Sequence, residues 1–502
     1  MTSNKESVRA RFAPSPTGYP HLGSIWQALL VWLYARHNKG VFVLRIEDTD
    51  RTRFVADAEA KIVEALRWFD LTIDEGPDIG GEYGPYRQSA RLKIYQQHAD
   101  ILINSGSAYY CFCSAERLQK LRKEQATRHE APRYDGLCRD IAPTQAVRRS
   151  AAGEPYVIRM KMPRDGVTSF TDIIHGQISF RNEVIDDQII MKSDGWPTYH
   201  LASVIDDHLM RIGPLVIRGE EWLPSTPKHL ELYRAFGWSA PAYAHLPLIL
   251  GVDRSKLSKR HFSSEALALR SEGYLPEAVV NFLVLLGWSS KTDQELFTLQ
   301  ELIERFGIAQ VNKSGAIFDR QKLDWMNAQY IRHLSPTKLV ELALPYLFST
   351  KLIEERSENM FRLADGRMVE STYILNALDS VRDRLKRLND VSQAVSVFCK
   401  IDNYEPGLLI WKGSDINLAH KALNRVSAFL GELSESNFTA EILEAKIKQL
   451  ITDEGWKTGD VLWPVRVALS GLRESSGPFL IMSVLGKKES LRRIASACAL
   501  LN

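Results

Sequence analysis

The sequence lacks the features that mark secreted, membrane-bound and disulfide-stabilised proteins. Its 502 residues include only five cysteines, an odd number. No apolar run approaches the roughly 20 residues that cross a bilayer, and the ten residues before Arg11 lack the apolar core of a signal peptide. The net charge of +3 is too small to indicate a nucleic-acid partner by itself. We therefore expect a cytoplasmic protein in a reducing compartment, with no membrane partner and no disulfide framework.

The N-terminal segment has the pattern of a strand, a helix and a second strand. Residues 10–14 are short and end in proline, and residues 23–37 are apolar on most sides. Late cations and Gly40 are typical of a helix end. Residues 41–46 then form an apolar run suited to a buried strand. This order predicts a parallel βαβ unit, followed by a further helix over 56–69.

The pattern of apolar residues changes more than once after this unit. Residues 106–199 contain short alternating runs separated by turns, which indicate an α+β insertion. Buried-strand runs return at 215–219 and 247–251. From about residue 330 the periodicity is helical, with few strand runs. At roughly 100–200 residues a domain, the length is enough for three to five domains.

The first stretch that carries chemistry is RFAPSPTGYPHLG, residues 11–23. It places His21 between the end of a predicted strand and the start of a predicted helix. A helix N-terminus offers free N–H groups and a positive partial charge, which suit phosphate. Gly18 and Gly23 leave room for a nucleotide to approach the backbone. The alternative interpretation is a proline-rich turn with a surface histidine.

The second stretch is KLSKR, residues 256–260, directly after an apolar run. Lys256 and Lys259 flank Ser258, and this spacing on a loop lets two ammonium groups converge on one polyphosphate. By itself such a stretch is more often a solvated basic loop.

Taken together, the two stretches resemble the two signature motifs of class I aminoacyl-tRNA synthetases. His21 and Gly23 fall on the first motif, and Lys256, Ser258 and Lys259 on the second. The flanking stretches narrow the resemblance to the bacterial-type glutamyl-tRNA synthetases: LRIEDTDRTR (44–53), DEGPDIGGEYGPYRQSAR (74–91), GWPTYHLASVIDDHL (195–209) and VIRGEEW (216–222). The resemblance is specific through residue 330 and weaker beyond it.

The resemblance implies a glutamate–tRNA ligase that forms glutamyl adenylate and then charges tRNA(Glu), with tRNA(Gln) as a second candidate substrate. It implies ATP as a substrate and Mg²⁺ as a cofactor. His21, Lys256 and Lys259 are the implied catalytic residues. The implied ATP-binding residues are Pro20, His21, Gly23, Lys256, Ser258 and Lys259.

The resemblance also implies a glutamate site, whose positions are Arg11, Ala13, Ser15, Glu47, Tyr199, Ser203 and Arg218. Glu47 would hold the ammonium group of the substrate. Arg218 would read its side-chain carboxylate, because a planar guanidinium matches a carboxylate bidentately. Ser203 departs from the asparagine of the family pattern, so a direct contact from this position is less strongly implied.

Three cysteines form a candidate metal site. Cys111, Cys113 and Cys138 supply three thiolates, and Zn²⁺ prefers four ligands. Tyr134 and Asp140 are the two candidates for the fourth ligand. The spacing resembles a zinc-binding insertion found in part of the family, so we expect one structural Zn²⁺. The alternative is three reduced cysteines in a small domain.

The implied architecture is a multidomain protein with an α/β Rossmann-type catalytic domain, an α+β insertion and an all-α anticodon-binding half. The expected segments are 1–105 and 200–255 for the catalytic domain, 106–199 for the insertion, which binds the tRNA acceptor end, 256–330 for the stem-contact region, and 331–400 and 401–502 for two helical subdomains. We expect a monomer.

Two alternatives remain. A glutaminyl-tRNA synthetase would have a β-barrel anticodon end, and a non-catalytic tRNA-binding paralogue would lack the phosphate-contacting residues. A truncated paralogue is excluded because it would lack about the last 170 residues.

Overall fold

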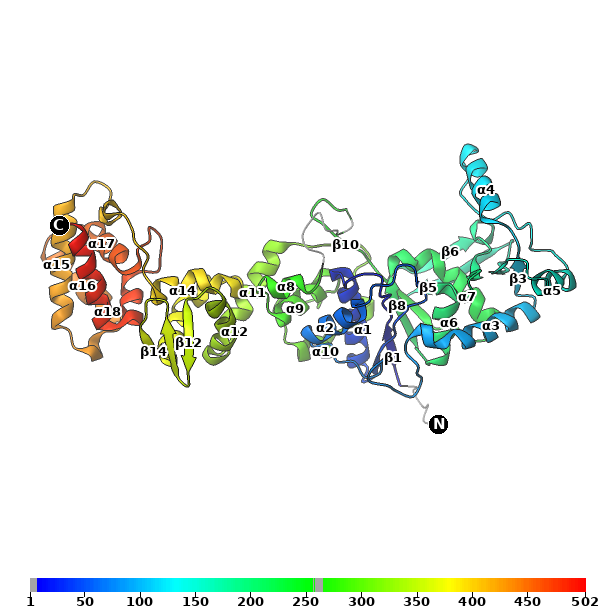
Figure 1. Cartoon of the computed structure of the whole chain (residues 1–502), viewed down its shortest axis with the longest axis horizontal. Coiled ribbons are helices and arrows are strands. Elements are labelled where there is room, and N and C mark those ends of the chain that lie inside the picture. Colours follow the sequence, from blue (N-terminus) through cyan, green and yellow to red (C-terminus); the bar gives the residue numbers. More distant parts are fainter. Residues whose placement is uncertain (1–6, 256, 258–264) are drawn as a thin grey trace. The chain divides into compact units, whose positions relative to one another are not determined.

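The computed structural model describes residues 7–255, 257 and 265–502. The chain forms two compact units. The first contains Met1–Leu269 and Pro276–Arg320, and the second contains Arg270–Leu275 and Gln321–Asn502. Figure 1 follows the chain from blue at the N-terminus to red at the C-terminus. The finer division into six segments stays a prediction.

The first unit begins with the predicted βαβ arrangement. Strands β1 (Arg9–Phe12) and β2 (Val41–Leu44) pair in parallel, and helix α1 (Leu22–His37) connects them. Most of α1 is buried, which explains why its sequence is apolar on more than one face. A Cβ atom at Gly40 would collide with the carbonyl of Val8, so the entry into β2 requires glycine.

A second pair of parallel strands, β8 (Leu215–Gly219) and β9 (Ala242–Leu246), lies next to this unit. Strand β1 packs beside β8. The sheet that contains β8 has the order β6-β5-β9-β8. The strands predicted at 41–46 and 215–219 therefore belong to one α/β core, as expected for a Rossmann-type fold.

The segment between 106 and 199 contains the predicted mixture of helices and short strands. Its elements are β3 (Ala108–Cys111), α4 (Ala115–Thr127), α5 (Pro143–Ala151), β4 (Val157–Met160), β5 (Val167–Asp172), β6 (Gly176–Arg181) and β7 (Ile189–Met191). Strands β3, β4 and β7 form an antiparallel sheet. The hairpin of β5 and β6 joins the main sheet instead, because β5 pairs with β9. In Figure 1 helix α4 stands away from the rest of this unit.

The remaining elements complete the catalytic core and the region after it. They are α2 (Ala58–Trp68), α3 (Leu92–Asn104), α6 (Tyr199–Leu209), α7 (Thr226–Ala235), β10 (Ile249–Leu250), α8 (Ala268–Ser271), α9 (Pro276–Gly287), α10 (Leu299–Arg305) and β11 (Ala316–Ile317). Helix α2 confirms the helix predicted over 56–69. Helix α9 packs on α1, where the indole N–H of Trp26 donates to the carbonyl of Leu283 at 2.8 Å.

The second unit is mainly helical, as predicted. Its helices are α11 (Arg320–His333), α12 (Pro336–Ser349), α13 (Ser371–Val381), α14 (Val391–Cys399), α15 (Ile416–Glu432), α16 (Ala440–Asp453), α17 (Thr458–Ser470) and α18 (Pro478–Leu500). The expectation of an all-α half needs one correction, because β12 (Ile353–Ser357), β13 (Met360–Leu363) and β14 (Met368–Glu370) form an antiparallel sheet. These strands are short, and β12 exposes four of its five residues, so β12 lacks the alternating apolar pattern of a half-buried strand.

None of the helices in the described part of the chain is both long and apolar enough to cross a membrane.

Candidate active site

A cleft of about 910 Å³ opens in the first unit, beyond the ends of β1 and β8. Most of the residues predicted for the glutamate and nucleotide sites line it: Arg11, Ala13, Ser15, Pro20, His21, Glu47, Tyr199 and Arg218. Gly23 lines a neighbouring cavity, and Ser203 lies behind Arg218, to which it is hydrogen-bonded. The fold therefore gathers on one cleft positions that are up to 207 residues apart in the sequence.

Strand and helix ends carry the polar side chains of this cleft. Arg11 and Arg218 are near the carboxyl ends of β1 and β8. Glu47 follows β2, and Tyr199 is the first residue of α6. In parallel α/β sheets, ligands bind beyond the carboxyl ends of strands, where free backbone groups and loops meet.

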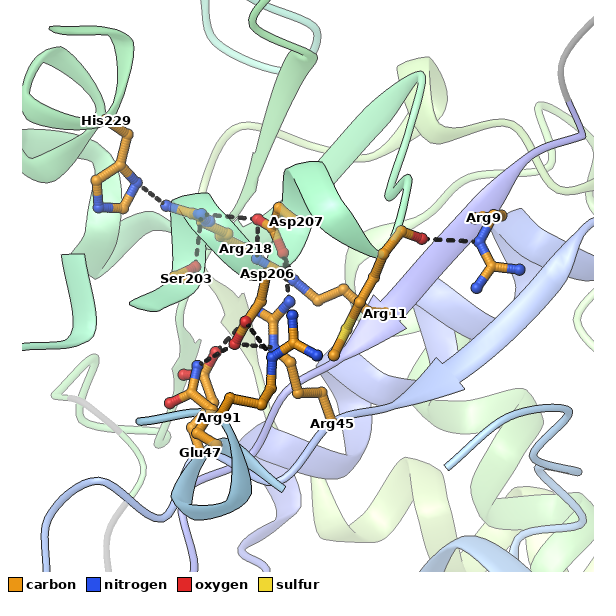
Figure 2. A network of polar contacts seen from close by, with 12 residues as sticks. Arg9, Arg11, Arg45, Glu47, Arg91, Ser203, Asp206, Asp207, Arg218 and His229 are labelled. Atoms are coloured by element: carbon orange, nitrogen blue, oxygen red, sulfur yellow. Dashed lines mark hydrogen bonds and ion pairs between the residues drawn. The ribbon is translucent and has the colours of Figure 1, made fainter. Parts of the chain in front are cut away.

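Figure 2 shows that the carboxylate of Asp207, in α6, binds three guanidinium groups. It accepts hydrogen bonds from Arg11 at 3.1 Å, Arg45 at 2.7 Å and Arg218 at 3.3 Å. All four side chains are at most 4% exposed. Burial alone would raise the pKa of Asp207, but the three arginines outweigh burial and hold the pKa far below its ordinary value.

The neighbouring carboxylate of Asp206 forms a second buried anchor. It accepts hydrogen bonds from Arg91 at 2.7 Å, and from Gln88 and Tyr95 at 2.8 Å each. Gln88 also lines the cleft. Asp206 therefore links α6 to the segment at residues 88–91 and to helix α3, while Asp207 links α6 to the ends of β1, β2 and β8.

Glu47 is the carboxylate of this network that reaches the cleft wall. It accepts a hydrogen bond from Arg45 at 2.9 Å. Burial raises the pKa of Glu47, and the charges of Arg45 and Arg11 oppose this rise. The charged groups of the network are Arg11, Arg45, Arg91, Arg218, Glu47, Asp206 and Asp207. With all of them ionised, this network has one excess positive charge, and three of its members, Arg11, Glu47 and Arg218, line the cleft.

The guanidinium of Arg218 is held by contacts at both terminal nitrogens. Nη2 donates to Ser203 at 3.2 Å, and Nη1 donates to Nδ1 of His229. The buried Nε has no hydrogen-bond partner among the described residues. Because Nε is unpaired among these residues, the guanidinium of Arg218 can still donate to a further acceptor. The ring centroid of Tyr199 lies 5.8 Å from the guanidinium carbon and 4.1 Å from the ring centroid of Trp222.

His21 is the N-cap of helix α1. Its Nδ1 accepts a hydrogen bond from the backbone N–H of Ser24 at 3.1 Å. A neutral imidazole that accepts at Nδ1 carries its proton on Nε2. His21 thus lies at the N-terminal end of a helix dipole, where negative charge is stabilised, with its ring proton on Nε2.

A second cavity of about 450 Å³ shares His21, Ser24 and Gln27 with the cleft. Gly23 and Leu257 also line it. The two adjoining cavities offer room for a nucleotide with its phosphates near the start of α1.

Lys256, Ser258 and Lys259 lie outside the described residues. Two described residues near them lie beside the site: Leu257 lines the second cavity, and the backbone N–H of Ala266 donates to the carbonyl of Pro20 at 3.0 Å.

The three predicted cysteines meet in the insertion, where the sulfur atoms of Cys111, Cys113 and Cys138 lie within 4.8 Å of one another. The hydroxyl of Tyr134 lies 3.4 Å from the sulfur of Cys111 and 3.5 Å from that of Cys113. Asp140 is different: its side chain is 78% exposed and lies 3.9 Å from Lys161. Of the two candidates for a fourth ligand, Tyr134 is the one beside the sulfurs.

Several residues of the site were not predicted from the sequence, above all Asp206, Asp207 and His229. Asp206 and Asp207 stand next to each other inside the apolar helix α6. Since aspartate is almost never fully buried without a partner, an acidic pair in an apolar helix is a signal of buried ion pairs. His229 gives no such signal, because a single histidine in a helix does not by itself indicate a functional site.

Two family models match the chain. One, described as "tRNA synthetases class I (E and Q), catalytic domain", matches residues 7–325. The other, described as "Anticodon binding domain", matches residues 338–498. The first match ends at residue 325, four residues after Gln321, where the second unit resumes.

Relatives with similar sequences and structures cover nearly the whole chain. A glutamate–tRNA ligase of Dehalococcoides mccartyi (strain CBDB1) is 47% identical over 496 residues, which cover 99% of this chain and 98% of the relative. A glutamate–tRNA ligase of Clostridium novyi (strain NT) is 42% identical, with 97% of each chain covered. The crystal structure of a glutamate tRNA ligase from Elizabethkingia meningosepticum CCUG26117, in complex with its amino acid, has a TM-score of 0.88 and 34% identity, covering 99% of this chain and 100% of that one.

We predict that Asp207→Asn destabilises the first unit by about 3–5 kcal/mol at neutral pH, because three buried guanidinium groups lose their shared carboxylate. The lowered pKa fixes the pH dependence: the carboxylate stabilises the fold above its ordinary value of 3.8 and less as the pH falls below it. The difference between variant and wild type should therefore shrink below about pH 4. Urea unfolding at pH 7 and in acidic buffers measures this difference.

Asp194→Asn is the control, because this carboxylate is 55% exposed and paired with Lys192. Its effect should stay within about 0.5 kcal/mol. Equal stability of Asp207→Asn and wild type at pH 7 would contradict the role given to Asp207.

Proposed function

The chain belongs to the glutamate–tRNA ligases, and we propose that it activates L-glutamate with ATP to glutamyl adenylate and transfers the glutamyl group to the 3′ end of tRNA(Glu). The observation that supports this most directly is the charged network that holds Arg11, Glu47 and Arg218 on the cleft. The single excess positive charge of the network matches the single net negative charge of glutamate. The amino-acid complex of the Elizabethkingia relative agrees with such a site.

The substrate would meet complementary groups on this wall. Glu47 supplies a carboxylate for its ammonium group, and Arg218 supplies donors for its side-chain carboxylate. Arg11 also lines the cleft and adds positive charge there, while its guanidinium donates to Asp207 and to the carbonyl of Ile217. Ala13, Ser15 and Tyr199 complete the wall.

ATP would occupy the second cavity, with its phosphates at the start of α1. The displacement at the α-phosphate is accelerated mainly by positioning of the reactants and by stabilisation of the charge that develops in the transition state. His21 would donate its Nε2–H to a phosphate oxygen, where charge builds in the transition state. Lys256 and Lys259 would add ammonium groups, a role supported by the neighbouring residues Leu257 and Ala266. The Mg²⁺ that this chemistry requires would be bound mainly by the ATP phosphates and would offset charge on the leaving pyrophosphate.

The helical second unit supports the choice of tRNA partner. Residues 338–498 match an anticodon-binding model and contain helices with one small sheet instead of a β-barrel. This disfavours a glutaminyl-tRNA synthetase. Charging assays on purified tRNA(Glu) and tRNA(Gln) separate an enzyme that accepts one tRNA from an enzyme that accepts both. A monomer remains our prediction for the oligomeric state.

The cysteine cluster fits one structural Zn²⁺ in the insertion. Three thiolates and the hydroxyl of Tyr134 provide four ligand atoms around one point, the number that structural zinc sites use. When bound, the ion would offset the charge of the thiolates and crosslink β3 to the loop that contains Tyr134 and Cys138.

We expect Arg218→Gln to lose at least about 3 kcal/mol in kcat/KM for glutamate, on the scale of breaking a buried charge pair. The preference for glutamate over glutamine should fall with it, because glutamine directs an amide donor at the donors of the arginine. ATP–pyrophosphate exchange with both amino acids, in the presence of tRNA, measures the change. Arg234→Gln, an exposed arginine of α7, is the control. Unchanged selectivity in Arg218→Gln would direct attention to Arg11 instead.

Two variants of His21 separate its catalytic role from its capping role. His21→Ala removes the cap and the Nε2 donor, whereas asparagine is a good N-cap but places no donor at the Nε2 position. Both should slow activation by about 10²–10³, as loss of one transition-state donor does. Only His21→Ala should also lose about 1 kcal/mol of stability. Single-turnover adenylate formation and thermal unfolding test this, and near-normal activation in either variant would remove His21 from the mechanism.

Metal analysis of the purified protein should find about one zinc per chain. Cys138→Ser should lose the metal and loosen the insertion, while Asp140→Asn should keep it. Limited proteolysis detects the loosening, and the catalytic core should stay folded. A metal-free wild-type protein with full activity and normal melting would contradict the zinc site.

A further inference from the structure

His229 in α7 has no role in the reaction described above, yet its contacts link it directly to the substrate wall. It is fully buried, and its Nδ1 accepts a hydrogen bond from Nη1 of Arg218. Its Nε2 lies 2.9 Å from Nδ1 of His200. Figure 2 shows Arg218 between His229 on one side and Ser203 and Asp207 on the other.

The chemistry of arginine fixes the tautomer of this histidine. A guanidinium only donates, so Nδ1 of His229 must carry a lone pair, and the ring proton is on Nε2. That proton is then donated to Nδ1 of His200. Burial, followed by the charge of Arg218, holds the pKa of His229 well below its ordinary value. The pKa of His200 is lowered to about 3, mainly by burial. Both rings are therefore neutral at physiological pH.

The hydrogen bond to His229 acts on Arg218 from the side opposite to the attraction of Asp207. Nη2 of Arg218 interacts with Asp207, the carboxylate that already binds Arg11 and Arg45. Without an acceptor at Nη1, the guanidinium would be free to turn toward Asp207. Acceptors at both ends instead fix the plane of the group, which also lies against Tyr199.

We propose that His229 is a positioning residue for amino-acid specificity, whose unprotonated Nδ1 holds the guanidinium of Arg218 in the orientation that reads the side-chain carboxylate of the substrate. The proposal rests on the proposed function, since it assigns that carboxylate to Arg218. A neutral acceptor suits this role, because it fixes the arginine without cancelling the positive charge that attracts the substrate.

Two substitutions of similar size separate this role from simple packing. His229→Leu keeps apolar bulk and removes the acceptor. His229→Asn places an amide oxygen near the position of Nδ1 and keeps it. We expect His229→Leu to raise KM for glutamate by about 10–100-fold, the worth of a hydrogen bond to a charged group. Its kcat and its KM for ATP should change much less, and its preference for glutamate over glutamine should fall at least about tenfold. His229→Asn should recover most of both losses.

The measurement is tRNA-dependent ATP–pyrophosphate exchange with each amino acid, alongside circular dichroism and thermal unfolding. His98→Leu, a partly exposed histidine of α3 bonded to the carbonyl of Ile94, controls for a histidine-to-leucine change elsewhere in the unit. Unchanged KM and selectivity in a folded His229→Leu would overturn the proposal, as would equal losses in the leucine and asparagine variants. A wild-type protein without glutamate-dependent exchange would instead overturn the proposed function, and this proposal with it.

Discussion

The active site depends on one buried carboxylate. Asp207 binds arginines from β1, from the end of β2 and from β8, so a single residue of α6 sets the positions of three cations. Their mutual repulsion in a water-poor environment is acceptable only while this carboxylate is present and ionised. The strand ends, the helix and the charge of the cleft wall are therefore fixed by the same interaction.

The two carboxylates of α6 stabilise the fold but leave the wall positively charged. Asp206 neutralises Arg91 and takes two further hydrogen bonds, which leaves the remaining arginines for Asp207 and Glu47. A bound glutamate would supply the missing negative charge at Arg218 while Glu47 accepts its ammonium group. Glutamine is nearly the same size but lacks that charge, so in the proposed site electrostatics would separate the two amino acids where shape cannot.

The sequence predicted the parts of the structure that depend on local signals. The apolar run of α1, the prolines before it and Gly40 after it identify the βαβ unit. Resemblance to known synthetases predicted Arg11, Glu47, Tyr199 and Arg218, which the fold gathers on one cleft. The contacts that hold these residues were not predictable in this way: Arg11 and Asp207 are 196 residues apart, and no local pattern pairs them. The sheet of the second unit was missed because its strands are short, and two of them, β12 and β14, are mostly exposed.

Ser203 shows how the departure from the family pattern fits this site. Its hydroxyl is buried and accepts a hydrogen bond from Arg218 at 3.2 Å, so the position faces the arginine and not the open cleft. Ser203, Asp207 and His229 then supply three acceptors to a group that can only donate. The buried Nε remains without an acceptor among the described residues. An unpaired buried N–H is costly. An arginine that its neighbours hold in place, but that keeps one N–H unpaired, is therefore stabilised most by a ligand carboxylate that accepts from it. If Arg218 binds the side-chain carboxylate as proposed, the specificity of the site follows from the interactions around Arg218 as much as from Arg218 itself.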